Sequence, residues 1–211
     1  MKGFLIQLLL IFLFVLHIPA QSETIQKAQK IINEVVEKSL PELKNKQIEV
    51  KIFQSDSDYF RARFSYGKYL TFQKMRYIVF VNPQVFAKNA PENGIRSILA
   101  HELAHVLYFS ERNRFELLGL VNLSAKSFTQ KFEHRADLEA ISRGYGDGLK
   151  AYRAWLYQNI PQKNLAEKKH DYFSPEEIDK VMELFQQNPA KIVEWRKNNW
   201  EDLDYLWKDK K

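Results

Sequence analysis

The chain of 211 residues contains no cysteine at all. Disulfide bonds therefore contribute nothing to its fold, although export from a cell does not require them. Attachment to a membrane through a lipid-modified cysteine is excluded for the same reason. The fold must depend on its apolar core and on non-covalent contacts between side chains.

Glycine and proline are scarce as well, with seven of each. No linker rich in either residue divides the chain, and the sequence contains neither an internal repeat nor a low-complexity tract. Beyond the N-terminus, no apolar stretch is long enough to span a bilayer. The 191 residues that follow position 20 have the usual length of one domain with a substantial core.

The N-terminus has the pattern of a secretory signal peptide. Lys2 provides a positive start, residues 4–16 form an apolar run broken only by Gln7, and Ala20 precedes a polar sequence. We expect cleavage after Ala20 and export to the periplasm, the cell surface or the medium. Without cleavage, the same segment would anchor the protein in a membrane.

The net charge is +6, and residues 42–88 hold nine Lys or Arg against four Asp or Glu. Interleaved aromatic residues make this composition similar to that of nucleic-acid-binding proteins. A sheet with cationic outer positions has the same composition, however, and export argues against DNA or RNA. We therefore expect no nucleic acid partner.

The motif HELAH at residues 101–105 carries most of the functional information in the chain. It lies in a largely apolar segment, and this pattern predicts a buried helix that begins after residues 91–94. Two histidines four residues apart on a helix share a face, where both imidazoles can bind one zinc ion. Glu102 lies about 100° further round, where it can contact a water molecule on the metal. Two incidental histidines on a surface helix are the alternative, but the apolar flanks argue against it.

A catalytic zinc site needs a third protein ligand. A second helical pattern over residues 132–141 carries Glu133 and Asp137, which are four apart and share a face. One carboxylate there could complete the zinc shell, and the other could orient a ligand histidine through its second ring nitrogen. We favour Glu133 as the ligand over a solvated acidic stripe. The predicted site holds one Zn2+ ion per chain through His101, His105 and Glu133.

HELAH followed by EHRAD at residues 133–137 resembles the gluzincin branch of the zincin metallopeptidases, in particular the group of the heat-shock-type membrane peptidases and the CAAX-prenyl endopeptidases. The resemblance covers about residues 77–141. It implies His101, His105 and Glu133 as zinc ligands, Glu102 as general base, and Asp137 as the carboxylate behind a ligand. Because the chain lacks the internal membrane spans of those enzymes, the likeness points to a small soluble exported relative, and membrane-protein substrates do not carry over to it.

The resulting hypothesis is a zinc metalloendopeptidase with a peptide or protein substrate. Glu102 would accept a proton from the attacking water and return it to the leaving amine. A further donor should stabilise the oxyanion. His170 and Tyr172 are the main candidates and His134 and Tyr145 the others, and no spacing decides among them. Two alternatives stay open: an exported zinc-containing interaction protein without turnover, and a zinc hydrolase acting on envelope peptides.

The predicted fold is α+β and zincin-like, with a small mixed or antiparallel sheet packed on the HELAH helix and a largely helical C-terminal part. The elements expected before that helix are a helix over 23–39, a strand over 47–53, a hairpin with strands 59–66 and 69–73, and a strand over 76–81. By the resemblance, residues 77–81 hold an extended peptide through backbone hydrogen bonds; the alternative is a central core strand. The expected division is a signal peptide over 1–20, a zincin-like catalytic core over 21–148 and a helical extension packed on the core over 149–211.

Overall fold

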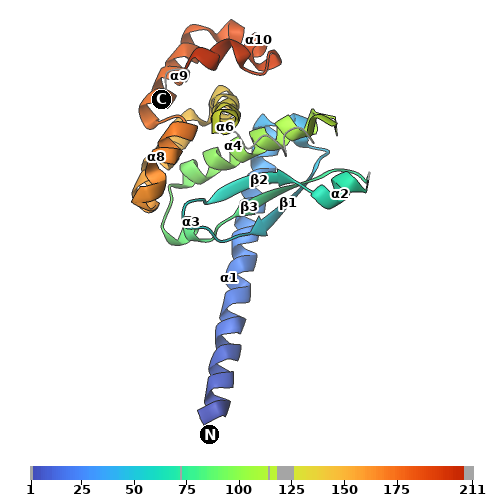
Figure 1. Cartoon of the computed structure of the whole chain (residues 1–211), viewed down its shortest axis with the longest axis vertical. Coiled ribbons are helices and arrows are strands. Elements are labelled where there is room, and N and C mark those ends of the chain that lie inside the picture. Colours follow the sequence, from blue (N-terminus) through green and yellow to red (C-terminus); the bar gives the residue numbers. More distant parts are fainter. Residues whose placement is uncertain (1, 72, 114, 118–125, 207–211) are drawn as a thin grey trace.

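The computed structural model describes the backbone of residues 2–71, 73–113, 115–117 and 126–206, and the side chains of these residues from 21 onward except those of 126–127. The fold is α+β, as predicted, with helices on a three-stranded sheet (Figure 1). The strands are β1 (Gln47–Ile52), β2 (Phe60–Phe64) and β3 (Arg76–Val81). The α-helices are α1 (Lys2–Ser39), α2 (Tyr66–Leu70), α3 (Gln84–Ala87), α4 (Glu92–Ser110), α6 (Lys126–Ala140), α7 (Gly146–Asn159), α8 (Gln162–Asp171), α9 (Pro175–Gln187) and α10 (Ile192–Lys197).

The sheet is mixed and has the strand order β1-β3-β2. β3 pairs in parallel with β1 and antiparallel with β2. Tyr77, Val79 and Val81 of β3 are buried while the residues between them are only partly buried, so the alternating sequence places one face of the strand in the core. The strand over residues 77–81 is therefore central, and the free edge next to α4 belongs to β2.

The predicted hairpin is wrong in its second half. Residues 66–70 form helix α2, and the antiparallel partner of β2 is β3. Tyr69 is 9% exposed and its ring lies 6.0 Å from that of Phe64. A helical turn after β2 brings Tyr69 back against Phe64, which an extended second strand would not do. Packing of aromatic residues has therefore overridden the alternating pattern.

Helix α4, which carries the HELAH motif, is the centre of the core. Its buried residues occur on every side of the helix, because it contacts the sheet, α1, α6 and α7. The approach of α7 is very close at Gly148, where a Cβ atom would collide with the Asn93 carbonyl and the Ser97 hydroxyl. Glycine at this position therefore allows the backbones of α4 and α7 to come together.

The C-terminal part is helical, as expected. Helix α9 begins with a capping box in which Ser174 and Glu177 bond each other's backbone amides. Helix α7 runs across the predicted boundary at residue 148, and Leu149 and Leu156 belong to the same apolar core as α4. The residues after 148 thus help to shape the central part of the molecule.

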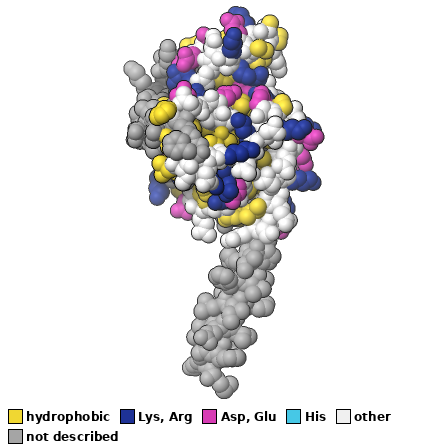
Figure 2. All heavy atoms as spheres, turned by 90° about the vertical axis from the view of Figure 1, so that its right-hand side faces the viewer, with side chains coloured by type: hydrophobic (Ala, Val, Ile, Leu, Met, Phe, Trp, Pro, Cys, Tyr) yellow, Lys and Arg dark blue, Asp and Glu magenta, His cyan; other side chains and the backbone are white. Residues whose placement is uncertain are grey.

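Helix α1 contains the helix predicted over 23–39 and continues through Ala20 without a break. Figure 1 shows it passing along the sheet, where Ala28, Ile32 and Val35 are buried. Cleavage after Ala20 stays a prediction. Among the residues that the structure describes, no helix has both the length and the apolar character needed to cross a membrane. On the face drawn in Figure 2, basic and acidic side chains lie interspersed.

Candidate metal centre

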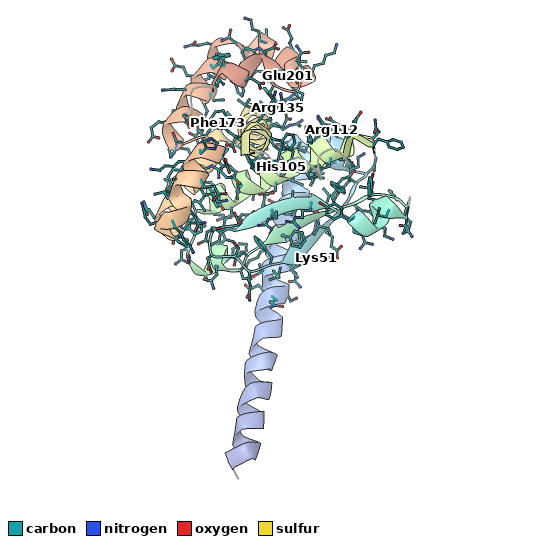
Figure 3. The ribbon with its side chains drawn as sticks, viewed as in Figure 1. Lys51, His105, Arg112, Arg135, Phe173 and Glu201 are labelled. Atoms are coloured by element: carbon teal, nitrogen blue, oxygen red, sulfur yellow. The ribbon has the colours of Figure 1, made fainter. Side chains whose placement is uncertain are left out.

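Three side chains from α4 and α6 converge on one point. The Nε2 atoms of His101 and His105 lie 3.2 Å apart, and Glu133 Oε2 lies 3.1 Å from the first and 3.0 Å from the second. His105 is labelled on α4 in Figure 3, beneath α6. The two helices therefore bring together the three residues that the sequence analysis selected as metal ligands.

The triangle of donor atoms has the size that a zinc ion requires. Zinc binds imidazole nitrogen and carboxylate oxygen at about 2.0–2.2 Å, so two ligands of a tetrahedral site lie about 3.3 Å apart or slightly more. The three observed separations differ from this value by a few tenths of an ångström. Two histidines and one glutamate also form one of the known ligand sets of catalytic zinc. The residues present fit a zinc ion.

Burial and charge together determine how the ligands ionise. Burial alone would lower the pKa of His101, but the Asp137 and Glu133 carboxylates outweigh it and raise this pKa to about 9. Burial would likewise raise the pKa of Glu133, but the imidazoles of His105 and His101 hold it well below its usual range. Without a metal, the site therefore holds a protonated His101 beside an ionised Glu133.

Asp137 lies behind His101, one turn along α6 from Glu133. Its Oδ1 atom is 2.7 Å from His101 Nδ1, and the Asp137 side chain is completely buried. A carboxylate in this position fixes the orientation of the imidazole and directs the Nε2 atom toward the metal position. This is the arrangement in which a second carboxylate orients a ligand histidine.

Two residues that hold Asp137 were not predicted from the sequence. Arg153 of α7 is 1% exposed and donates from Nη2 to Asp137 Oδ1 at 3.0 Å. The backbone N–H of Phe173 donates to Asp137 Oδ2 at 3.1 Å. Burial would raise the pKa of Asp137, but Arg153 and His101 lower it. Arg153 could have been found as the one charged residue on the apolar stripe of its helix, between Leu149 and Leu156.

Glu102 interacts electrostatically with His101, His105 and Glu133 but lies outside the cluster that these three residues form. It is 5% exposed, and burial raises the pKa of its carboxyl group. The backbone N–H of Ala62, on the edge strand β2, lowers this pKa, but by less than burial raises it. A carboxylate with a raised pKa, held next to a metal position, has the properties of a general base.

Of the four candidate oxyanion donors, the structure brings only Tyr172 to the ligands, with its ring centroid 6.0 Å from that of His101. Burial raises the pKa of Tyr172 well above its ordinary value, so its hydroxyl stays protonated. His170 instead lies against Asp171, with Nδ1 2.8 Å from the carboxylate. His134 donates to the Gln130 carbonyl of its own helix.

The hydroxyl oxygen of Tyr145, the fourth candidate, lies 2.9 Å from Ser39 Oγ at the end of α1. Its hydroxyl belongs to the contact between α1 and the segment that follows α6. In this position it contributes to packing between elements of the fold.

In comparisons with known proteins, no family model, no curated protein and no solved structure matches this chain.

We expect zinc binding to release a proton. The pKa of His101 is about 9 in the metal-free site. Its imidazole must therefore lose a proton before Nε2 can bind zinc while Nδ1 donates to Asp137. The affinity for Zn2+ should rise at least about tenfold per pH unit between about pH 6.5 and 8.5. Calorimetric titration with Zn2+ in pH buffers of different ionisation enthalpy measures both the affinity and the number of protons released. A constant affinity across this range would contradict the protonation state.

Arg153→Met should destabilise the protein by about 3–5 kcal/mol, because it leaves the buried Asp137 carboxylate without its cation. Lys150→Met is the matched control, since Lys150 also comes from α7 and forms a 2.6 Å ion pair with Asp179 that is largely exposed. The control should change stability little. Urea unfolding followed by circular dichroism measures both variants, and equal losses would show that Arg153 has no special role.

Proposed function

We propose that the protein is an exported zinc metallopeptidase that hydrolyses peptide bonds, with Glu102 as general base. One observation carries this proposal. Three ligand atoms lie at zinc-like separations, while the glutamate inside the HELAH motif lies beside them without joining the cluster. A purely structural zinc site has no use for this additional buried carboxylate.

His101, His105 and Glu133 would hold the zinc ion, a ligand set known from catalytic zinc sites. The bound ion would supply Lewis-acid chemistry, which makes water more acidic and polarises a carbonyl group. Asp137 keeps the Nδ1 side of His101 occupied by a hydrogen bond, so the Nε2 atom is the one available to the metal.

Glu102 would move the proton during hydrolysis. Its carboxyl group borders a small cavity that Tyr172 also lines. Because burial raises its pKa, the carboxylate is a stronger base than an exposed glutamate. It would accept the proton of the attacking water and deliver it to the nitrogen of the leaving amine, so that the same residue acts as base and then as acid.

Tyr172 is the side chain best placed to donate a hydrogen bond to the oxyanion. The Arg153 guanidinium lies 4.1 Å from the centre of its ring, which holds the ring from one side. Since its pKa is raised, the phenol keeps the proton that it would donate. A donor fixed before the reaction stabilises developing negative charge more than a mobile one.

The edge strand β2 offers backbone groups to an extended peptide. Ser65 N–H donates to the Arg76 carbonyl of β3, so in this antiparallel pair the residues at alternate positions bond β3. The backbone groups of Phe60, Ala62 and Phe64 therefore point away from β3. The Ala62 N–H is close enough to Glu102 to lower its pKa, and its neighbours at the same edge would align a substrate strand beside that residue.

Glu102→Gln should abolish peptide hydrolysis and keep the metal. The amide preserves the shape of the side chain but cannot accept the proton, so cleavage of casein should fall at least about 100-fold. Metal analysis of the same preparations should give one zinc per chain in both the native protein and the variant. Cleavage by the variant at the native rate would contradict the role of Glu102.

A second pair of variants separates the candidate donors. Tyr172→Phe should lower kcat by about 100-fold with little change in KM, because it removes a hydrogen bond made in the transition state. His170→Ala is the matched control from the same segment, and its kcat should stay near the native value. Zinc content should be unchanged in both variants. Equal kcat values for Tyr172→Phe and the native protein would exclude Tyr172 as the donor.

A further inference from the structure

The cavity that borders Glu102 is too small for a substrate. Its volume is about 20 Å³, and Glu102 itself is only 5% exposed. A space of this size holds about one water molecule. A peptide that reaches Glu102 from this side can do so only if one of the elements lining the cavity moves.

Among the helices that line this cavity, α8 is the least buried. The cavity is lined by residues of α4, α7 and α8 and by the loop before β2. Helices α4 and α7 contain completely buried residues such as Leu99, Leu103 and Leu149. No residue of α8 is buried. Helices with few buried apolar contacts open at low free-energy cost, so α8 is the part of this wall that can move.

Both ends of α8 are attached to the core. Before the helix, the carbonyl of Asn159 accepts hydrogen bonds from Tyr59 at 2.8 Å and from Lys88 at 3.1 Å. After it, Phe173 is 1% exposed and its backbone N–H bonds Asp137. The backbone is extended at Ile160 and again at Tyr172. Helix α8 is therefore attached to the core at both ends, through Asn159 before it and Phe173 after it. Figure 3 labels Phe173 at the upper end of the helix.

An ion pair connects α8 to the opposite wall of the cavity. Lys168 Nζ of α8 lies 2.6 Å from Asp58 Oδ1 in the loop before β2. The two side chains are 14% and 23% exposed, and both residues line the cavity beside Glu102. Asp58 is itself held by Arg61 at 3.0 Å. The Lys168–Asp58 pair thus joins the two walls of the cavity from opposite sides.

We propose that α8 is a gate over Glu102, that the Lys168–Asp58 ion pair holds it closed, and that substrate enters when this pair breaks. The consequence for catalysis rests on the proposed function of Glu102, whereas the gating motion does not. With the gate closed, Tyr172 lies beside His101 and bulk water is kept from Glu102. Opening exposes Glu102 to a peptide.

Hydrogen–deuterium exchange of the full chain tests the gate directly. Lys168→Met keeps the length of the side chain and removes its charge, so amides of residues 162–171 should exchange about two- to fivefold faster, as expected for the loss of one partly exposed ion pair. Lys168→Arg keeps the cation and should exchange like the native protein. Lys150→Met removes an ion pair of the same 2.6 Å length elsewhere and should leave α8 unchanged.

Unchanged exchange of α8 in Lys168→Met would overturn the proposal. An equal increase along the whole chain would also overturn it, because that would mean general loosening of the fold. Where casein cleavage is present, kcat/KM should rise in Lys168→Met and stay native in the other two variants. If no variant and no native protein cleaves casein, the peptidase assignment fails while the exchange result still decides whether α8 is a gate.

Discussion

The buried carboxylate of Asp137 is the group on which the site depends. It accepts hydrogen bonds from His101 on α4, from Arg153 on α7 and from the backbone of Phe173 after α8, while it belongs to α6. One side chain therefore connects four segments that are distant in sequence. A buried charge of this kind is tolerated only when it is fully paired, so these segments must occupy their observed positions together.

This constraint relates the fold to the proposed chemistry. The same contacts that neutralise Asp137 orient His101 toward His105 and Glu133, and place Tyr172, the neighbour of Phe173, next to the ligands. Arg153 contacts both groups, since its guanidinium donates a hydrogen bond to Asp137 and lies over the Tyr172 ring. The rigid part of the site is thus built on α4, α6 and α7. The polar helix α8 closes the remaining side, where movement costs least.

The sequence predicts which side chains cluster at the candidate site better than it predicts their surroundings. The pairs His101–His105 and Glu133–Asp137 follow from the spacing within each helix, since residues four apart share a face whatever the fold around them. Contacts between distant elements have no such local signal. The role of Arg153, the central position of β3 and the choice of Tyr172 over His170 depend on how α7, α8 and the sheet pack. The second strand of the predicted hairpin failed for the same reason, because Tyr69 packs on Phe64.

X-ray absorption spectroscopy at the zinc edge tests the central claim most directly. It reports the atoms bound to the metal in the purified protein, whatever the substrate. We expect one zinc per chain with two imidazole nitrogens and carboxylate or water oxygens at about 2.0–2.2 Å. His101→Ala should either lose the zinc or keep it with at most one imidazole nitrogen. A protein that binds no zinc, or that binds it through other residues so that His101→Ala leaves the spectrum unchanged, would contradict the account.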